Sequence, residues 1–295
     1  MTKQYRVGRL TYRVIFAQGG KNDDELIASS RPFEVPVDDE PAIFELTVDD
    51  SFRPDVRGKE IGQFNTGGNN HGVYQKDDGS YQIHISDYLG RQCCLMEATQ
   101  DFSHVNLALN GNFAMRTFGL NNALMMTYAF SSCEQGTVLM HASVVRENGY
   151  GYLFLGVSGT GKSTHTGNWL RYIPGTDLMN DDNPVVRFVD GQTVVFGSPW
   201  SGKTPCYRNI EAPVGAFVQL NQAPYNRIRP QTPIEAFASL LPSCSIMKWD
   251  ARDYRGTCDT VTHFIEDVPT YYLENLPDEA AVRLSYETIR RKEEA

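Results

Sequence analysis

Residues 156–163 read Gly156-Val157-Ser158-Gly159-Thr160-Gly161-Lys162-Ser163, and they match the pattern G-x-x-x-x-G-K-[S/T] at every position. An apolar segment, residues 152–155, precedes them, and a helix-compatible segment, residues 163–170, follows. Glycines let the backbone curl so that successive N–H groups face an anion, and the N-terminus of the following helix adds partial positive charge. The stretch therefore predicts a phosphate-binding loop between a strand and a helix.

Several residues of this loop have side chains or backbone amides suited to a nucleotide. Lys162 can place a point charge on the β- and γ-phosphates, and the Ser163 hydroxyl can ligate Mg²⁺. We expect ATP and Mg²⁺ to bind here. The candidate nucleotide-binding residues are Gly156, Ser158, Gly159, Thr160, Gly161, Lys162, Ser163 and Thr164.

Two adjacent carboxylates follow the loop about twenty residues later, where Asp181 and Asp182 come directly after the apolar pair Leu178-Met179. Neighbouring carboxylates repel each other unless a cation lies between them. One of them can bind Mg²⁺ while the other accepts a proton from a substrate hydroxyl. The alternative is an acidic turn, because Asp-Asp-Asn-Pro is also good turn chemistry.

The first part of the chain has strand and turn signals that predict a small antiparallel sheet. The strongest is a hairpin, in which residues 73–76 and 81–85 flank Asp77-Asp78-Gly79-Ser80. Residues 43–48 and 92–97 are further strands. From Phe113 to Phe130 the apolar spacing becomes helical. We place a domain boundary after this helix, which gives a β-rich lobe over 1–132 and a catalytic domain over 133–295.

The second part alternates strands, turns and helices. Asn148-Gly149 and Asp190-Gly191 predict hairpin turns, and Thr232 and Glu235 fit a helix cap. The predicted elements are strands over 137–145, 152–155, 214–220 and 270–273, two short strands within 184–196, and helices beginning near Thr232 and Asp278.

The segment 139–182 resembles the HPr kinase / phosphoenolpyruvate carboxykinase-like group of phosphate-loop enzymes. The resemblance rests on a strand with His141-Ala142, a hairpin, the glycine-rich loop and Asp181-Asp182. It implies an α+β or α/β fold in which a P-loop kinase domain with a mixed sheet follows the β-rich lobe in the chain. It also implies that Lys162 and Ser163 hold phosphates and metal, that Asp182 contacts the metal, that Asp181 accepts the hydroxyl proton and that His141 tunes that carboxylate.

The chain departs from both branches of the group. The additional metal-binding Lys and His and the oxaloacetate-binding arginines of carboxykinases have no counterpart, nor has the Glu-Val-Arg-Gly-Leu-Gly-like run of HPr kinases. At the position of that run, this chain has a loop, residues 197–204. In or near this loop, Trp200 could stack on a base, and Lys203 and Arg208 could steady the transferred phosphoryl group.

These observations favour an ATP-dependent kinase that phosphorylates a hydroxyl of a small molecule, serine-like or sugar- or polyol-like. Three alternatives stay open: an HPr-type protein serine kinase/phosphorylase, a carboxykinase-like enzyme, and a non-catalytic ATP-binding regulatory module. His165, in the first turn after the loop, is expected at the surface.

Composition limits the partners. The 295 residues carry 36 acidic and 27 basic side chains, a formal charge of −9, so we expect no nucleic-acid partner. No apolar stretch approaches the roughly 20 residues of a membrane span. The six cysteines form no Cys-x-x-Cys pair, and we expect free thiols rather than zinc ligands. Without a signal peptide at the N-terminus, we expect a cytoplasmic protein. Association into a homo-oligomer stays open.

Overall fold

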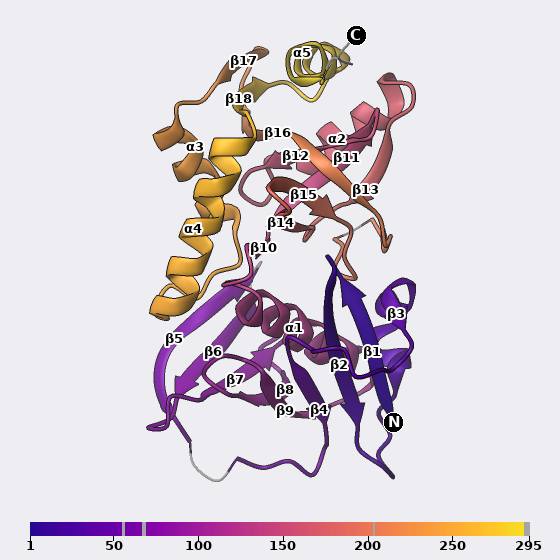
Figure 1. Ribbon diagram of the computed structural model, residues 1–295, viewed down its shortest axis with the longest axis vertical. Helices are drawn as coiled ribbons and strands as arrows, with labels where there is room; N and C mark the ends of the chain where they lie inside the picture. The colour runs from indigo at the N-terminus through magenta and orange to yellow at the C-terminus, as the bar shows by residue number, and fades with distance from the viewer. Residues whose placement is uncertain (55–56, 67–68, 203, 292–295) are drawn as a thin grey trace. The chain divides into compact units, whose positions relative to one another are not determined.

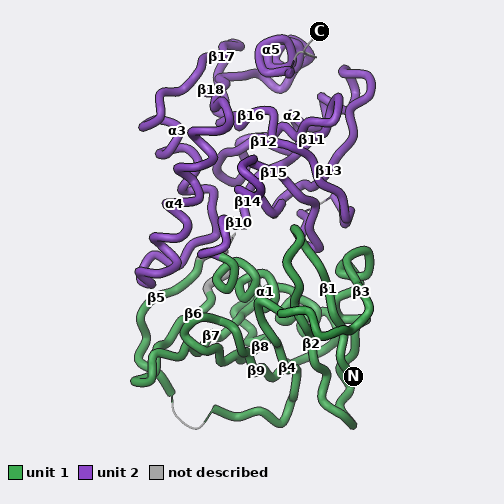
Figure 2. Tube along the Cα trace, in the orientation of Figure 1, with its two compact units in different colours: residues 1–132 green, residues 133–295 purple. Residues whose placement is uncertain are grey.

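The computed structural model describes residues 1–54, 57–66, 69–202 and 204–291. The chain divides into two compact units, Met1–Ser132 and Cys133–Ala295 (Figure 2). Each unit contains a large sheet with parallel and antiparallel strands together with helices, so the chain is a mixed α/β protein. Among the described helices, none combines the length and apolar character that a membrane crossing requires.

Unit 1 is built on a sheet whose nine described strands follow the order β3-β1-β2-β4-β9-β8-β7-β6-β5 (Figure 1). Its elements are β1 (Thr2–Val7), β2 (Leu10–Phe16), the 3-10 helix η1 (Asp24–Phe33), β3 (Glu34–Val35), β4 (Glu45–Val48), β5 (Lys59–Thr66), β6 (Asn69–Gln75), β7 (Tyr81–Ser86), β8 (Gln92–Ala98), β9 (His104–Leu109) and α1 (Phe113–Ser131).

This sheet is not the antiparallel one that the sequence predicts. β4 pairs in parallel with both β2 and β9. The connection from β2 to β4 runs through η1 and β3 and brings the chain back to the edge from which β2 started, so the two strands share a direction. An alternating pattern reports which face of a strand is buried but not the direction of its neighbours. The hairpin of β6 and β7 is antiparallel, as predicted.

Helix α1 confirms the predicted helix and packs on the sheet of unit 1. Its N-cap Asn112 accepts a hydrogen bond from Met115 N. Gly119 allows the close approach, because a Cβ at this position would lie 2.9 Å from Cys94 Cβ. Most of the helix is buried, which explains its apolar sequence.

Unit 2 holds a second sheet of nine described strands, with the order β10-β14-β15-β16-β12-β11-β13 and with β18 joining β16 to β17. Its elements are β10 (Thr137–Leu139), β11 (Ala142–Glu147), β12 (Tyr150–Leu155), α2 (Lys162–Tyr172), β13 (Asp177–Asn180), β14 (Val185–Val189), β15 (Gln192–Phe196), β16 (Glu211–Gln222), β17 (Arg227–Pro230), α3 (Pro233–Leu240), the 3-10 helix η2 (Leu241–Ser243), α4 (Ala251–Asp267), β18 (Thr270–Asn275) and α5 (Glu279–Ile289).

Local signals placed the turns and one helix start of unit 2 correctly. At both predicted hairpin turns the two central residues have positive φ, 48° and 79° at Asn148 and Gly149, and 56° and 77° at Asp190 and Gly191. Helix α3 begins with a complete capping box between Thr232 and Glu235. These predictions are confirmed.

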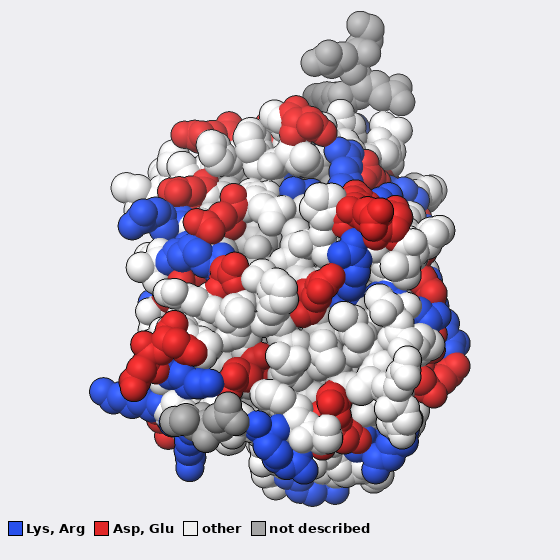
Figure 3. Space-filling view, turned by 60° about the horizontal axis from the view of Figure 1, so that its bottom comes forward, with Lys and Arg blue, Asp and Glu red and all other residues white. Residues whose placement is uncertain are grey.

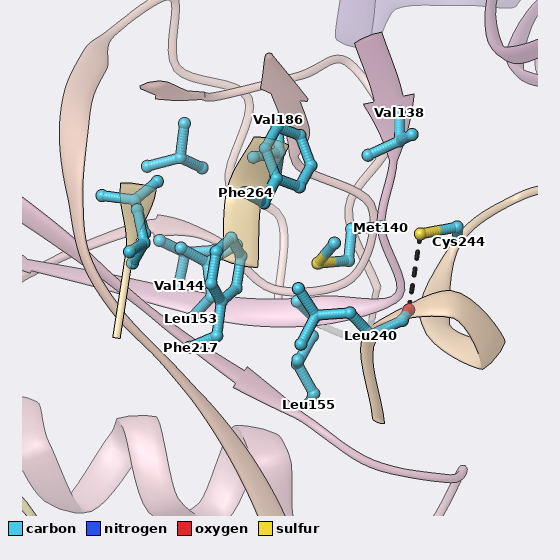
Figure 4. Packing of buried hydrophobic residues seen from close by; sticks show 14 of the residues in the cluster. Val138, Met140, Val144, Leu153, Leu155, Val186, Phe217, Leu240, Cys244 and Phe264 are labelled. Carbon is cyan, nitrogen blue, oxygen red and sulfur yellow. Dashed lines mark hydrogen bonds between the residues drawn. The ribbon is translucent and has the colours of Figure 1, made fainter. Parts of the chain in front are cut away.

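The sheet of unit 2 is covered on both faces. Along β12, Leu153 and Leu155 pack into one cluster with side chains of α3 and α4, such as Leu240 and Phe264 (Figure 4). Tyr152 and Phe154 point the other way, into a second cluster with side chains of α2 and α5. The strand is therefore apolar throughout, as expected for a sheet buried on both sides.

Two predictions for unit 2 differ from the structure. The single strand expected over 137–145 is two strands, because Met140 and His141 leave the extended ladder and β10 pairs with β14 while β11 pairs with β12 and β13. Helix α4 was not predicted. Its interior holds Gly256 and four threonines or valines, residues of low helix propensity, so packing in the α3–α4 cluster outweighs local preference.

Candidate functional site

Four strands of unit 2 run in the same direction and end at the same edge of the sheet. β12 is parallel to β16, and β16 is parallel to β18 (Figure 1). β13 and β12 are both antiparallel to β11, so β13 shares their direction. In open α/β sheets, ligands bind beyond the carboxyl ends of such strands. This edge of the sheet is therefore the expected position of the site.

Residues 156–163, called the glycine loop below, connect the carboxyl end of β12 to the start of α2. Three glycines have positive φ, 151° at Gly156, 88° at Gly159 and 95° at Gly161, a region that side chains rarely adopt. A Cβ at Gly159 or Gly161 would meet no heavy atom within 4 Å, so open space borders the backbone there. Ser158, Ser163 and Thr164 are exposed beside this space. The loop has the backbone shape that an anion cradle requires.

Lys162 is the first residue of α2, and its ammonium group turns back over the loop. Nζ donates to Gly156 O at 2.8 Å and lies 2.9 Å from His141 Nε2. The side chain is buried, and burial lowers the pKa of Lys162, while Asp182 and Asp181 nearby act in the opposite direction.

His141 connects this lysine to an acidic residue. Its Nδ1 lies 2.9 Å from Asp182 Oδ1, and both side chains are partly exposed, 42% and 32%. An ammonium group has only donors, so Nε2 accepts from Lys162 and the ring proton resides on Nδ1, which donates to Asp182. Lys162, His141 and Asp182 therefore form one hydrogen-bonded chain at the sheet edge.

Asp181 has a different environment from its neighbour. It is 6% exposed, and its Oδ1 accepts from the Ser143 hydroxyl at 2.8 Å. Ser143 in turn lies 2.8 Å from the Thr166 hydroxyl of α2. Among the described residues, Asp181 Oδ2 has no hydrogen-bond partner although it is buried. A buried acceptor without a donor is costly, so a cation or a donor next to this oxygen would stabilise it.

The buried Asn180 side chain holds the turn that carries the two aspartates. Its Oδ1 accepts from Asp182 N at 2.9 Å, and its Nδ2 donates to Ser198 Oγ and Trp200 O, both at 3.1 Å. The loop after β15 therefore lies against the acidic turn, and a Cβ at Gly202 would lie 2.8 Å from Asp181 O. Trp200 itself is buried, so its ring is not the exposed stacking surface that the sequence suggested.

Of the remaining candidates, Arg208 and His165 are not brought to this cluster. Lys203 lies outside the described residues. Arg208 donates to Asp177 Oδ2 at 2.8 Å and to Leu178 O, at the start of β13 and so at the opposite end of that strand from Asp181. His165 is 1% exposed, which corrects the expectation of a surface residue, and burial lowers its pKa to about 4.

Sequence reasoning missed Ser143, Thr166 and Asn180. Thr166 follows Lys162 by four residues, so helical spacing alone indicates that it lies one turn above the lysine. Ser143 follows His141 by two residues, and strand spacing would place both on one face, had the strand been continuous. No local signal identifies the role of Asn180, because its partners are 18 and 20 residues away.

A cavity of about 630 Å³ adjoins the glycine loop. Its walls come from the loop, from the first turn of α2 and from the segments that follow β16 and β18. Gln222 at the end of β16 donates from Nε2 to Gly159 O at 3.1 Å and so ties one wall to the loop. Within the described part of the chain, no group of three or more His, Cys, Asp or Glu side chains is arranged to hold a metal ion.

Figure 3 shows one face, on which acidic and basic side chains are interspersed rather than gathered into a field of one sign. The site is identified by the local geometry of the polar and ionic groups at the glycine loop and the acidic turn.

Comparison with known proteins gives little beyond this geometry. No protein-family model matches the chain, and no curated protein matches it. Among solved structures, the HPr(Ser) kinase/phosphatase from Coxiella burnetii is similar over 52% of this chain and 93% of its own, with 12% sequence identity and a TM-score of 0.31. A likeness at this TM-score is distant, so the function proposed below rests on the site itself.

Proposed function

We propose that this protein is an ATP-dependent kinase that transfers the γ-phosphoryl group to a hydroxyl of a small molecule. The observation that carries the proposal is the hydrogen-bonded chain from Lys162 through His141 to Asp182, which borders the glycine loop. This cluster combines a cation that can bind phosphate, a backbone loop shaped to cradle an anion, and a carboxylate that is hydrogen-bonded to a histidine. Phosphoryl transfer needs mostly positioning and electrostatic stabilisation, and these groups supply both.

The residues at the edge fit the phosphates of a nucleotide. The glycine loop leaves open space beside Gly159 and Gly161, where a Cβ would meet nothing. The Lys162 ammonium, held by Gly156 O and His141, is within the same cluster and can exchange these partners for phosphate oxygens. The α2 N-terminus adds a favourable field for the same anion.

The donor set also fits Mg²⁺. The exposed Ser163 hydroxyl and the acidic turn would hold the ion, and Asp181 Oδ2 is a buried acceptor without a partner among the described residues. When bound, Mg²⁺ would neutralise charge on the phosphates.

The geometry favours an exchange of the roles that the resemblance implies for the two aspartates. A proton acceptor must reach the substrate hydroxyl, and Asp182 is the more exposed carboxylate and is held by His141. Asp181 is buried behind it and is held by Ser143. We therefore assign to Asp182 the role of accepting the proton of the substrate hydroxyl, and to Asp181 a structural or metal-holding role.

The test is transfer of label from γ-labelled ATP to a pool of hydroxyl metabolites that includes serine and polyols, with Mg²⁺ present. We expect one compound to gain label with the wild type and none with Asp182→Asn, while both proteins still bind nucleotide, measured as a rise in melting temperature. Nucleotide binding by the wild type without any labelled product would contradict the kinase proposal and favour a non-catalytic ATP-binding module.

A further inference from the structure

A further cavity of unit 2, called the α4 cavity below, is lined by one face of helix α4 and by residues of the segment 133–136. Its volume, about 480 Å³, lies within the range of sites for small organic ligands. The α4 residues of its lining recur every three or four positions, the spacing of one helix face, and include Arg252, Arg255, Gly256, Asp259, Thr260 and His263. None of the described lining residues belongs to the glycine loop or the acidic turn, so this cavity is separate from the catalytic cluster.

Close backbone contacts hold the two walls of the α4 cavity together. A Cβ at Gly256 would lie 2.5 Å from Cys133 O, so glycine is what allows the helix to approach the segment this closely. On the other side, Gly136 O accepts from Phe188 N at 2.8 Å. The Phe188 ring also stacks on the His263 ring of α4, with 4.7 Å between the ring centroids. A cavity held in this way needs little rearrangement to bind a ligand.

The α4 cavity carries charges of both signs. Arg252 pairs with Glu134 at 3.4 Å, and the Glu134 side chain is 63% exposed, so this ion pair is weak. Arg255 and Asp259 are both exposed, and neither forms an ion pair with another described residue. They are four residues apart, which is about 6 Å along the helix axis. The cavity thus presents a cation and an anion close together, and no described side chain compensates either of them.

These charges disfavour a ligand whose charge has one sign only. A phosphate ion would meet two guanidinium groups but also two carboxylates, and a simple amine would meet the two guanidinium groups. A molecule with a carboxylate and an ammonium group on one carbon atom avoids both conflicts. Its carboxylate can pair with a guanidinium group in the bidentate geometry, and its ammonium group can donate to a carboxylate one helical turn away.

We propose that the α4 cavity binds a free α-amino acid, at a site separate from the catalytic cluster. Arg255 pairs with the carboxylate of the ligand, and Asp259 accepts a hydrogen bond from its ammonium group. The ligand side chain then lies in the space between α4 and the segment 133–136. The proposal goes beyond the kinase activity and does not depend on it.

The experiment uses the full chain without nucleotide. The melting temperature is measured with each of the standard L-amino acids at millimolar concentration, because a ligand that binds the folded state raises it. Calorimetry then compares the amino acid that raises it most with two analogues: the carboxylic acid that lacks its amino group and the amine that lacks its carboxyl group.

The variants Arg255→Gln and Asp259→Asn each remove one charge of the cavity at an exposed position, so both proteins should fold. Arg171→Gln and Glu287→Gln are the matched controls. They remove exposed charges of the same two signs, on α2 and α5, from residues that do not line the cavity. Asp182→Asn tests whether the amino acid binds at the catalytic cluster instead.

We expect the wild type, both controls and Asp182→Asn to bind the amino acid at least about tenfold more tightly than either analogue. Arg255→Gln and Asp259→Asn should each bind it about tenfold or more weakly. In addition, Arg255→Gln should lose the preference over the amine, and Asp259→Asn the preference over the carboxylic acid.

Three results would overturn the site in the α4 cavity. They are no rise in melting temperature with any amino acid, equal affinities of the wild type for the amino acid and an analogue, and an unchanged affinity in either cavity variant. Loss of binding in Asp182→Asn alone would place the amino acid at the catalytic cluster and likewise refute the proposal. Because nucleotide is absent from every measurement, none of these results bears on whether the glycine loop binds ATP.

Discussion

His141 Nδ1 lies 2.9 Å from Asp182 Oδ1, although the two residues belong to different strand ends. The contact exists because the chain leaves the ladder at Met140 and His141 before β11 begins, while Asp182 follows the end of β13. The ring is held from both sides, since Nε2 accepts from Lys162. The histidine thus couples the proposed phosphate-binding cation to the proposed proton acceptor.

We predict that Asn and Gln at position 141 have different effects. In His141→Asn the side-chain amide lies near the position of the wild-type ring Nδ1 and can still donate to Asp182. In His141→Gln the amide lies near the position of Nε2 and can contact only Lys162. If His141 orients Asp182, His141→Gln should lower kcat by about 10²-fold or more, with a smaller loss in His141→Asn and little change in nucleotide affinity in either. Steady-state kinetics across pH measures both. Equal losses in the two variants would argue against the orienting role.

Removal of the Lys162 ammonium should weaken nucleotide binding. In Lys162→Ala the phosphates lose a charge-assisted donor, and Asp181 and Asp182 lose a nearby cation. We expect the affinity for MgATP, measured by calorimetry, to fall about 10²-fold. Lys248→Ala is the control, because Lys248 is an exposed lysine of the same unit and its loss should leave the affinity unchanged. An unchanged affinity of Lys162→Ala for MgATP would show that the glycine loop does not bind the nucleotide.

The Ser143–Asp181 hydrogen bond should couple the two residues energetically. Ser143 is buried and its hydroxyl donates to Asp181 Oδ1 at 2.8 Å. Ser143→Ala leaves a buried carboxylate with one donor fewer, so we expect the free energy of unfolding to fall by about 1–3 kcal/mol. In a double-mutant cycle with Asp181→Asn, urea unfolding should give a coupling energy of about 1 kcal/mol or more. Additive effects would show that the contact contributes nothing in solution.

Asp253 on α4 should make stability depend on pH. Burial raises the pKa of this carboxyl from its usual 3.8 to about 7, against the lowering effect of the Met247 N–H. Between about pH 4 and pH 7 the folded protein keeps a proton that the unfolded chain has lost, so this group makes the protein less stable as pH rises. His165, with its pKa lowered to about 4, has the opposite effect over much of the same range.

A comparison of variants isolates the contribution of Asp253. Asp253→Asn is neutral at every pH, so its free energy of unfolding relative to the wild type should increase by about 1.4 kcal/mol per pH unit within that window. Asp259→Asn, at an exposed position of the same helix, should show no such trend. A flat difference between Asp253→Asn and the wild type from pH 4 to pH 7 would mean that the carboxyl is not protonated in the fold.

Part of the site could be predicted from the sequence because its geometry is local. The glycine loop needs positive φ at positions that glycine occupies, and α2 begins where the sequence turns from glycines to Lys162. The Asp181-Asp182 pair was recognised by its chemistry and its distance from the loop. The different environments of the two aspartates, one buried against Ser143 and one held by His141, could not be predicted from their adjacency.

Other residues could not be placed because their partners are distant in the chain. Ser143 reaches Asp181 across 38 positions, and Arg208 pairs with Asp177 across 31. A guanidinium suits a phosphate and a carboxylate equally well, so the sequence could not show that Asp177, also bound by Arg146, already engages Arg208. The cavity lined by Gln222 and Asn275 depends on β16 and β18 ending side by side, which no local signal reports.

The amino-acid sequence by itself determined the hairpin turns, the capping box of α3 and the position of the glycine loop, because turn and cap conformations depend on residues a few positions apart. Only the tertiary structure decided the parallel direction of β4, the break at Met140 and His141, helix α4 and the set of side chains at the sheet edge. Each of these depends on pairing or packing between segments far apart in the chain, where the stabilising surface exists only once the partner is in place.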